Sequence, residues 1–436
     1  MTTATSAVPL SLWEATAAPP PPTAALEAHK TVDVAIIGAG FTGLSTALHL
    51  AEAGRSVAVL EAFEIGHGGS GRNNGMVIPA LSRTYPDGLR ARFGFERGSR
   101  FARLIGNSAT EAFALIRRLG IECDAVQGGW VQPAHSPGRA KLVHNRYEQW
   151  QGLGFDVEYL DESAVRKRVG SPLYHAGWLA KSGGHVHPLK LVRGLATAAI
   201  AAGAQIHTHS PALAVSEGVN KSGWEIATAR GKLSAGKVIV ATNAYTDNLF
   251  PSLRRSFVAT RSSQLATAPL PPDVIARVLK GGLASSDTHG DLFFAHPTPD
   301  NRIVTGGKLF FPHNRDVRLR THVTKRLAHI FPAVGAEVQF DYAWHGDVAI
   351  TVDFNPRLNQ LAPGILAVAG YSGRGVALSI ALGQRLAEAA QDIRAADDLD
   401  IPLTPVAPIP LHGLLAPLSR FELLRYRLND RREVRT

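Results

Sequence analysis

The chain has 436 residues, of which 45% are hydrophobic and 19% are charged, and its formal net charge is +10. A chain of this length can bury a large core without disulfide or metal support, and typically forms about two or three domains. Its one cysteine, Cys123, excludes an internal disulfide and any thiolate cluster for zinc or iron–sulfur.

No segment contains the roughly 18 continuous apolar residues that span a bilayer, and the N-terminus lacks the pattern of a secretory signal. We therefore expect a cytoplasmic protein without a membrane span. Six arginines lie between Arg420 and Arg435. No nucleic-acid-binding motif accompanies them, so we interpret this segment as a solvated basic tail and expect no nucleic-acid partner.

Residues 1–30 are rich in Ala, Thr and Pro and predict an extended arm. The amino-acid composition of the chain changes at Thr31. An apolar strand over 32–37 leads into a glycine turn, then a helix through Leu44 and Leu48, then a strand over 56–60 that ends at Glu61. This order predicts one βαβ unit.

Further helices are predicted over 100–120, 188–202 and 321–331, and strands dominate 205–241 and 256–345. A strand over 365–369 meets a second glycine-rich turn and a helix that continues to about Ile393, and the tail from Asp397 is proline-rich and irregular. Two glycine-rich strand-to-helix turns over 300 residues apart, at Gly38 and Gly370, suggest one nucleotide domain assembled from both ends of the chain.

The predicted fold class is therefore α/β, with a Rossmann-like nucleotide-binding domain and an inserted antiparallel-sheet α+β substrate domain. The nucleotide-binding domain comprises residues 31–100, 185–255 and 341–395. The substrate domain comprises 101–184 and 256–340, the N-terminal arm 1–30 and the C-terminal tail 396–436.

The segment from Gly38 to Gly43 is a G-x-G-x-x-G between the predicted strand and helix. The first glycine permits the tight turn, the second the approach of a pyrophosphate, and the third close packing of helix on strand. Glu61, at the tip of the next strand, can accept hydrogen bonds from ribose hydroxyls and disfavours a 2′-phosphate.

The segment after Glu61 favours FAD over NAD. A typical NAD domain continues with a second helix, whereas this chain has a loop from Gly66 to Met76 that contains Ser70 and Arg72. Its N–H groups and these two side chains can neutralise a pyrophosphate, and its far end can reach an isoalloxazine ring.

These motifs resemble the D-amino-acid oxidase superfamily of FAD enzymes, and within it the gamma-glutamylputrescine oxidase-like branch. The resemblance extends over essentially the whole chain, and it implies that the nucleotide-binding domain is an FAD-binding Rossmann-like domain of the glutathione-reductase type. It rests on residues 33–45, 60–62 and 69–73, then on 241–244, 342–346, 351–356 and 370–376, with the Ser-Leu-Trp-Glu start and the stretch at Tyr426. The candidate cofactor-binding residues are Gly38, Gly40, Phe41, Thr42, Gly43, Glu61, Ala62, Gly69, Ser70, Gly71, Arg72, Asn73, Asn74, Gly75, Met76, Ala241, Thr242, Gly346, Gly370, Tyr371, Ser372, Gly373, Arg374, Gly375 and Val376.

The resemblance implies oxidation of a carbon–nitrogen bond in a small amine or amino acid. The substrate passes a hydride to flavin N5, the imine is hydrolysed, and oxygen reoxidises the flavin to give hydrogen peroxide. Two alternatives stay open: a dehydrogenase that passes electrons to a quinone or a partner subunit, and a non-catalytic flavin-binding subunit. The loop from Ser372 to Val376 opens the last long helix, so its N–H groups can stabilise negative charge on the reduced flavin.

The chain also departs from the family pattern. Sarcosine oxidases attach flavin through a cysteine in the stretch that here reads 341–345 without one, so we expect non-covalent FAD. Their carboxylate-binding lysine corresponds to Ala377, so the substrate lacks a carboxylate beside its amine or binds it through another residue. The candidate catalytic residues are Trp344, His345 and Lys308. No metal is expected, although His185 and His187 are spaced by one residue.

Overall fold

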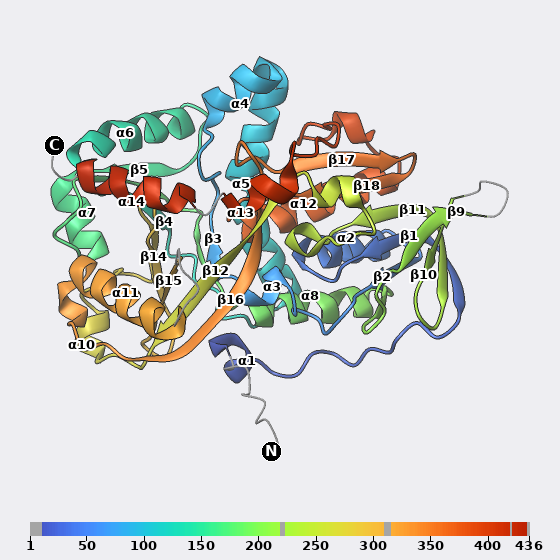
Figure 1. Ribbon diagram of the computed structural model, residues 1–436, viewed down its shortest axis with the longest axis horizontal. Helices are drawn as coiled ribbons and strands as arrows, with labels where there is room; N and C mark the ends of the chain where they lie inside the picture. The colour runs from blue at the N-terminus through green and yellow to red at the C-terminus, as the bar shows by residue number, and fades with distance from the viewer. Residues whose placement is uncertain (1–10, 219–222, 309–314, 419–420, 434–436) are drawn as a thin grey trace.

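A computed structural model describes residues 11–218, 223–308, 315–418 and 421–433 (Figure 1). The described chain contains two eight-stranded sheets and a two-stranded ribbon, with helices packed around them. The first sheet carries the glycine-rich turn after Ile37, and the second lies on the opposite side of the molecule in Figure 1.

The first sheet has the strand order β17-β18-β11-β1-β2-β8, and the strands β10 and β9 extend it from β11. The strand β1 pairs in parallel with both β2 and β11. Alternate residues of β1 enter two different cores, because Val34 and Ile36 point to one face and Ala35 and Ile37 to the other. The strands are β1 (His29–Ile37), β2 (Val57–Leu60), β8 (Gln205–His207), β9 (Ala214–Glu217), β10 (Trp224–Ala227), β11 (Lys232–Val240), β17 (Arg357–Ala362) and β18 (Ile365–Ala369).

Three helices from distant parts of the chain pack together beside this sheet: α2 (Phe41–Glu52), α8 (Pro188–Ala201) and α12 (Gly375–Ala390). The helix α5 (Phe95–Leu119) packs on α12 from the outside, and α4 (Pro86–Phe93) precedes it. The helices and strands predicted over these segments are confirmed.

The second sheet has the order β16-β12-β15-β14-β13-β4-β6-β5, and its pairs are antiparallel except β13 with β4. Its strands are β4 (Trp130–Ala134), β5 (Val157–Leu160), β6 (Ala176–Ala180), β12 (Val258–Thr267), β13 (Ala284–Ser286), β14 (Phe294–Pro297), β15 (Ile303–Gly307) and β16 (Phe340–Ile350). The helices α6 (Pro137–Gln151), α7 (Glu162–Val169), α10 (Pro272–Ile275) and α11 (Arg315–Ile330) belong to this half, and α9 (Pro251–Arg254) precedes β12.

The expected fold class, a Rossmann-like α/β domain joined to an antiparallel-sheet domain, is confirmed. The domain boundaries remain a proposal, with one difference of detail. We assigned residues 341–350 to the FAD-binding domain, but β16 pairs along its length with β12 in the second sheet. The short ribbon of β3 (Met76–Val77) and β7 (Gly184–His185) lies between the two halves.

The two ends of the chain differ from a simple extended arm and an irregular tail. In the arm, Ser11 caps a short helix α1 (Leu12–Thr16) by accepting from the main-chain N–H of Glu14. The tail prediction was wrong, because residues 412–418 and 421–433 form the helices α13 (His412–Leu418) and α14 (Phe421–Glu433). The prolines that suggested irregular structure lie mostly before His412, and 421–433 contain neither Pro nor Gly.

Candidate active site

The glycine turn after β1 is closed by backbone contacts that leave no room for side chains. Gly38 has a φ of +106°, and a Cβ there would lie 3.0 Å from the carbonyl oxygen of Ala241 at the end of β11. A Cβ on Gly43 would lie 2.0 Å from the carbonyl oxygen of Gly38. The helix α2 therefore starts directly against the strand end, with its positive dipole end toward the turn.

Glu61 ends β2 and faces this turn. One carboxylate oxygen accepts from the N–H of Ala39 at 2.8 Å, and the other accepts from the N–H of Phe63 at 3.1 Å. Burial raises the pKa of the Glu61 carboxyl, and these main-chain hydrogen bonds oppose that rise. The carboxylate is thus fixed beside the turn, in the position expected for a ribose partner.

The loop from Gly66 to Met76 contains the short helix α3 (Gly69–Arg72) and is shaped by its own side chains. The amide of Asn73 donates to the carbonyl oxygens of Gly69 at 3.0 Å and Ser70 at 2.8 Å, and its oxygen accepts from the N–H of Gly75 at 2.8 Å. The Ser70 hydroxyl accepts from the N–H of Phe41 at 2.9 Å and so ties the loop to α2. The loop is an ordered wall and not a free surface segment.

Three aromatic rings from distant segments hold the carbonyl groups of this loop. Trp344 donates to the carbonyl oxygen of Arg72 at 3.1 Å, and Trp13 donates to that of Asn73 at 2.9 Å. The Nε2 of His296 lies 2.6 Å from the carbonyl oxygen of Asn74. The sequence did not reveal these contacts, and the only available signal for Trp13 was the Ser-Leu-Trp-Glu start.

The C-terminal glycine-rich turn lies against the first one. Gly370 has a φ of +81°, and its N–H donates to the side-chain oxygen of Asn243 at 2.9 Å. The hydroxyl of Tyr371 lies 2.7 Å from that of Thr42 on α2, and burial raises the pKa of the Tyr371 phenol. These contacts place the N-terminal end of α12 beside the N-terminal end of α2.

All three segments line one cavity of about 2260 Å³ between the two halves of the molecule. The candidate cofactor residues that line it are Gly38, Gly40, Phe41, Thr42, Glu61, Ala62, Gly69, Ser70, Arg72, Asn73, Asn74, Met76, Ala241, Thr242, Gly346, Tyr371, Ser372, Gly373, Arg374, Gly375 and Val376. The other four, Gly43, Gly71, Gly75 and Gly370, lie behind this surface, where they permit close backbone packing. A cradle of this composition fits an extended dinucleotide with a flavin at its far end.

The wall beyond the C-terminal turn contains two buried arginines, Arg374 and Arg146. Burial lowers the pKa of Arg374 to about 10 and that of Arg146 to about 9, and the charge of Arg374 adds to the effect on Arg146. Arg374 donates weakly to the hydroxyl of Ser286 at 3.3 Å, and Arg146 donates to the side-chain oxygen of Gln132. Within the described part of the chain, neither guanidinium has a carboxylate partner within 4.0 Å. Nothing in the sequence around Arg146 had marked it as a site residue.

The same cavity wall carries a hydrogen-bonded acid–imidazole pair after β13. The Nδ1 of His289 lies 2.7 Å from a carboxylate oxygen of Asp287, which is fully buried. Nearby histidine and arginine charges lower the pKa of Asp287 although burial alone would raise it. In a neutral His289, a hydrogen bond from Nδ1–H to Asp287 leaves Nε2 as an acceptor.

The three candidate catalytic residues lie in different places. Lys308 lines the cavity, where burial lowers the pKa of its ammonium group. Trp344 is buried behind the loop that it holds, and His345 is exposed; neither lines the cavity. Ala377 is buried in α12 and also lies outside the cavity lining.

The paired histidines have structural partners. The ring of His185 stacks on that of His296 with centroids 4.4 Å apart, and His187 caps α8 by accepting from the N–H of Lys190. The described residues contain no group of three or more metal-binding side chains. Cys123 is buried, and burial raises the pKa of its thiol to about 12.

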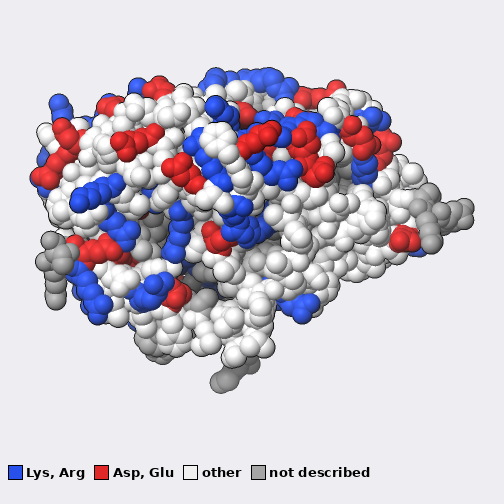
Figure 2. Space-filling view, turned by 90° about the horizontal axis from the view of Figure 1, so that it is seen from above, with Lys and Arg blue, Asp and Glu red and all other residues white. Residues whose placement is uncertain are grey.

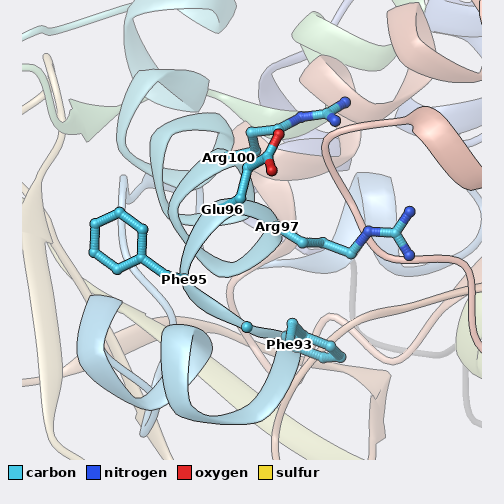
Figure 3. A pocket seen from close by; sticks show the side chains of 6 residues that line it. Phe93, Phe95, Glu96, Arg97 and Arg100 are labelled. Carbon is cyan, nitrogen blue, oxygen red and sulfur yellow. The ribbon is translucent and has the colours of Figure 1, made fainter.

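Two other surface features do not form a second site. A small hollow between α4 and α5 is lined by exposed and half-buried residues, and in Figure 3 Phe95 and Arg97 extend in opposite directions from it. Basic and acidic side chains are intermingled over the face in Figure 2, so the positive net charge does not collect in a single patch there. None of the helices among the described residues is long and apolar enough to cross a membrane.

A dinucleotide cradle on a Rossmann-like sheet, opening into a cavity covered by a second sheet, defines the FAD-dependent oxidoreductases of this architecture. Comparison with known proteins agrees: residues 33–389 match the family model described as DAO, FAD dependent oxidoreductase. The chain belongs to this family, as its motifs had indicated.

Among characterised relatives, the chain is 34% identical over 364 residues to gamma-glutamylputrescine oxidoreductase of Escherichia coli, covering 82% of this chain and 83% of that protein. It is 29% identical over 384 residues to the probable oxidoreductase OrdL of Rhizobium meliloti, covering 87% and 88%. Among solved structures, glycine oxidase of Geobacillus kaustophilus matches with a TM-score of 0.69 at 22% identity, covering 83% of this chain and 95% of that one. This last likeness supports the fold.

Proposed function

We propose that this protein oxidises the carbon–nitrogen bond of an amine that carries an anionic group elsewhere in the molecule. The observation that carries the proposal is the pair Arg146 and Arg374, two buried cations in the cavity without a carboxylate partner among the described residues. Buried charges are normally paired, so a substrate anion is the natural partner for this wall.

The relative from Escherichia coli suggests which amine. Gamma-glutamylputrescine carries the free primary amine of putrescine at one end, and the α-amino and α-carboxylate groups of a glutamyl group at the other. Such a molecule places its anion away from the reacting carbon, which agrees with the absence of a lysine at Ala377. A γ-glutamylated diamine is therefore the first candidate substrate.

FAD, when bound in the cradle, supplies the hydride acceptor at N5. The residues of this chain hold and orient the reactants around it. Arg146 and Arg374 bind the anionic end of the substrate, and the main-chain N–H groups at the start of α12 favour negative charge on the flavin ring. His289, oriented by Asp287, accepts a proton from the substrate ammonium through Nε2, since the amine must be neutral before its carbon gives up a hydride.

We propose that the FAD is held non-covalently. Cys123 is buried and does not line the cavity. His67 lines the cavity but packs its ring on that of Phe63, with centroids 4.1 Å apart. The denatured protein is expected to release FAD into the supernatant, and a yellow pellet would contradict this proposal.

Oxygen is the proposed electron acceptor, with hydrogen peroxide as product. Lys308 supports this choice, because it brings an amine of lowered pKa into the cavity. The alternative acceptor is a quinone or a partner protein. Substrate-reduced enzyme mixed with air distinguishes the two, because an oxidase regains its oxidised flavin spectrum within seconds and a dehydrogenase stays reduced until a dye or quinone is added.

The substrate proposal is tested by anaerobic bleaching of the flavin. γ-Glutamylputrescine, putrescine, N-acetylputrescine, sarcosine and D-amino acids are compared at equal concentrations. We expect the γ-glutamyl compound to reduce the flavin fastest. N-acetylputrescine keeps the amide and the amine but lacks the carboxylate, so equal rates with it and with the γ-glutamyl compound would overturn the role of the arginine pair. A protein that binds FAD but is reduced by none of these amines would favour a non-catalytic subunit.

A further inference from the structure

The two C-terminal helices expose a stripe of large apolar side chains. Leu414 and Leu418 of α13 are four residues apart, and Phe421, Leu424 and Leu428 of α14 are three and four residues apart, so each helix carries these side chains on one face. The exposed members of the stripe are Leu411, Leu414, Leu415, Leu418, Phe421, Leu424 and Leu428, with exposed fractions between 38% and 74%. Clusters of large exposed apolar side chains are typical of interaction sites.

Two side chains of α14, Asp430 and Arg427, attach this helix by polar contacts. The carboxylate of Asp430 accepts from the N–H groups of Gly290 at 2.8 Å and Asp291 at 3.0 Å. Arg427 donates to the carboxylate of Asp291 at 2.7 Å and to the carbonyl oxygen of Lys308 at 2.8 Å. These contacts join α14 to the loop after β13 and to the end of β15, and they leave Phe421, Leu424 and Leu428 exposed.

Exposed arginines flank the stripe at both ends. Arg431 and Arg432 follow Leu428 in α14. Arg254 and Arg255 lie near the other end of the stripe, because the main-chain carbonyl of Arg255 accepts from the N–H of Ile409 at 2.8 Å. No ion pair is formed by these four arginines with any residue that the structure describes. The nearest acidic residues of α14 are engaged elsewhere: Glu422 with Arg425, and Glu433 with Arg139 on α6.

We propose that the stripe together with its flanking arginines, the C-terminal apolar face, binds the surface of a bilayer rich in anionic phospholipid. An apolar helix face between basic side chains is the pattern by which peripheral proteins insert into the headgroup layer and pair with lipid phosphates. Two copies meeting through this face would bring like charges together, which disfavours a symmetric dimer. Nucleic acid would pair with the arginines but leave the leucines in water.

The proposed lipid contact does not depend on which amine is oxidised, but it would affect the substrate cavity. Leu423, Tyr426 and Asn429 of α14 line that cavity, and Leu415 of α13 lies at the border between the cavity and the C-terminal apolar face. Binding of the outer face to lipid would therefore place one wall of the substrate cavity at the membrane surface.

The test is flotation of the FAD-loaded full chain with vesicles of phosphatidylcholine alone, or of phosphatidylcholine with an equal amount of phosphatidylglycerol. We expect binding to the anionic vesicles and weakening by salt. The double variant Leu424→Asp, Leu428→Asp and the double variant Arg431→Glu, Arg432→Glu should each reduce the lipid partition coefficient by about tenfold or more.

Two control variants distinguish binding through this face from nonspecific hydrophobic adsorption and from nonspecific attraction between opposite charges. Phe95→Asp with Ile393→Asp removes two apolar residues elsewhere that are more exposed than Leu424 and Leu428, and Lys141→Glu with Lys167→Glu makes the same change in net charge as the arginine variant. Both controls should bind as the unaltered chain does. Absence of binding to anionic vesicles, or equal losses in the controls, would overturn the proposal. So would a dimer in light scattering that the two leucine substitutions dissociate, because a second copy would then cover the face. Flavin absorbance and circular dichroism verify that each variant is folded.

Discussion

The indole N–H of Trp13 donates to the main-chain carbonyl oxygen of Asn73 at 2.9 Å, across 60 residues of sequence. The ring also packs edge-on against Trp344 and lies parallel to His296, with centroids 5.5 and 6.4 Å away. The N-terminal arm thus supports the flavin loop from behind, although its described residues before His29 contribute no strand to either sheet.

Removing this support should weaken cofactor binding. Trp13→Ala is expected to cost about 3–5 kcal/mol in the free energy of unfolding, since a large buried ring is lost, and to raise the Kd for FAD. Trp13→Phe keeps much of the packing but loses the donor, so it should cost only about 1 kcal/mol. Flavin fluorescence titration and urea unfolding measure both effects. Wild-type FAD affinity in the alanine variant would contradict the role given to the arm.

Neutralising the arginine pair should damage recognition of the anion selectively. Arg146→Met is expected to raise KM for γ-glutamylputrescine by about 10- to 100-fold, because a charge-assisted hydrogen bond is worth about 1.5–3 kcal/mol. The KM for an amine without an anionic group should change little. Arg302→Met is the control, because Arg302 pairs with Asp300 and Asp341 and does not line the cavity. Equal losses for anionic and neutral amines would argue for a structural role.

Replacing the imidazole of the Asp287–His289 pair should change the pH profile. His289→Gln is expected to lower kcat/KM by about 100-fold near neutral pH, the lower end of what a positioned base contributes. The loss should shrink as pH rises, because the free substrate amine is then already neutral. The exposed His144 on α6 provides the control His144→Gln. A pH-independent loss in the His289 variant would contradict proton transfer.

His187 should make the fold less stable in acid. Burial lowers the pKa of its imidazole to about 4, with a smaller effect from the charge of Lys190. Its Nδ1 accepts from the N–H of Lys190, so a proton there would break the N-cap of α8. The unfolded state binds this proton from about pH 6.5 downward. Stability is therefore full above that pH and is lost progressively as pH falls toward about 4, by up to about 3 kcal/mol.

The measurement is urea unfolding at several pH values between these limits, with His187→Asn alongside. The asparagine can still accept from the Lys190 N–H but does not titrate. The free energy of unfolding of this variant should fall less steeply with decreasing pH than that of the unaltered chain. The same pH dependence in both proteins would contradict the role given to His187.

Glycine at the cofactor turn should be irreplaceable. A Cβ on Gly43 would lie 2.0 Å from the Gly38 carbonyl oxygen, so Gly43→Ala must push α2 away from β1. We expect this variant to lose FAD or to fail to fold. Gly138→Ala is the matched control on α6, where a Cβ meets nothing within 4 Å. Yellow Gly43→Ala protein with unaltered FAD affinity would refute the contact.

The sequence by itself determined the nucleotide half of this protein. The turn at Gly38 and the acidic tip at Glu61 are recognisable because their roles depend on neighbours within one βαβ unit, where strand, turn and helix follow each other directly. The helix over 188–201 and the strand over 365–369 were equally readable, since apolar periodicity and glycine turns are local signals.

Only the tertiary structure decided what faces the cofactor cavity from afar. Arg146 and Arg374 are 228 positions apart and meet because α6 and the start of α12 border the same cavity. Trp13 and Asn73 meet through a hydrogen bond that no periodicity encodes. The exposure of the apolar stripe from Leu411 onward could not be predicted either, because a leucine-rich helix is expected to be buried. Only polar contacts such as those of Asp430 show that α14 packs on the molecule through its other face. Side-chain chemistry can be read from a sequence, but the direction in which a helix presents it depends on contacts between segments far apart in the chain.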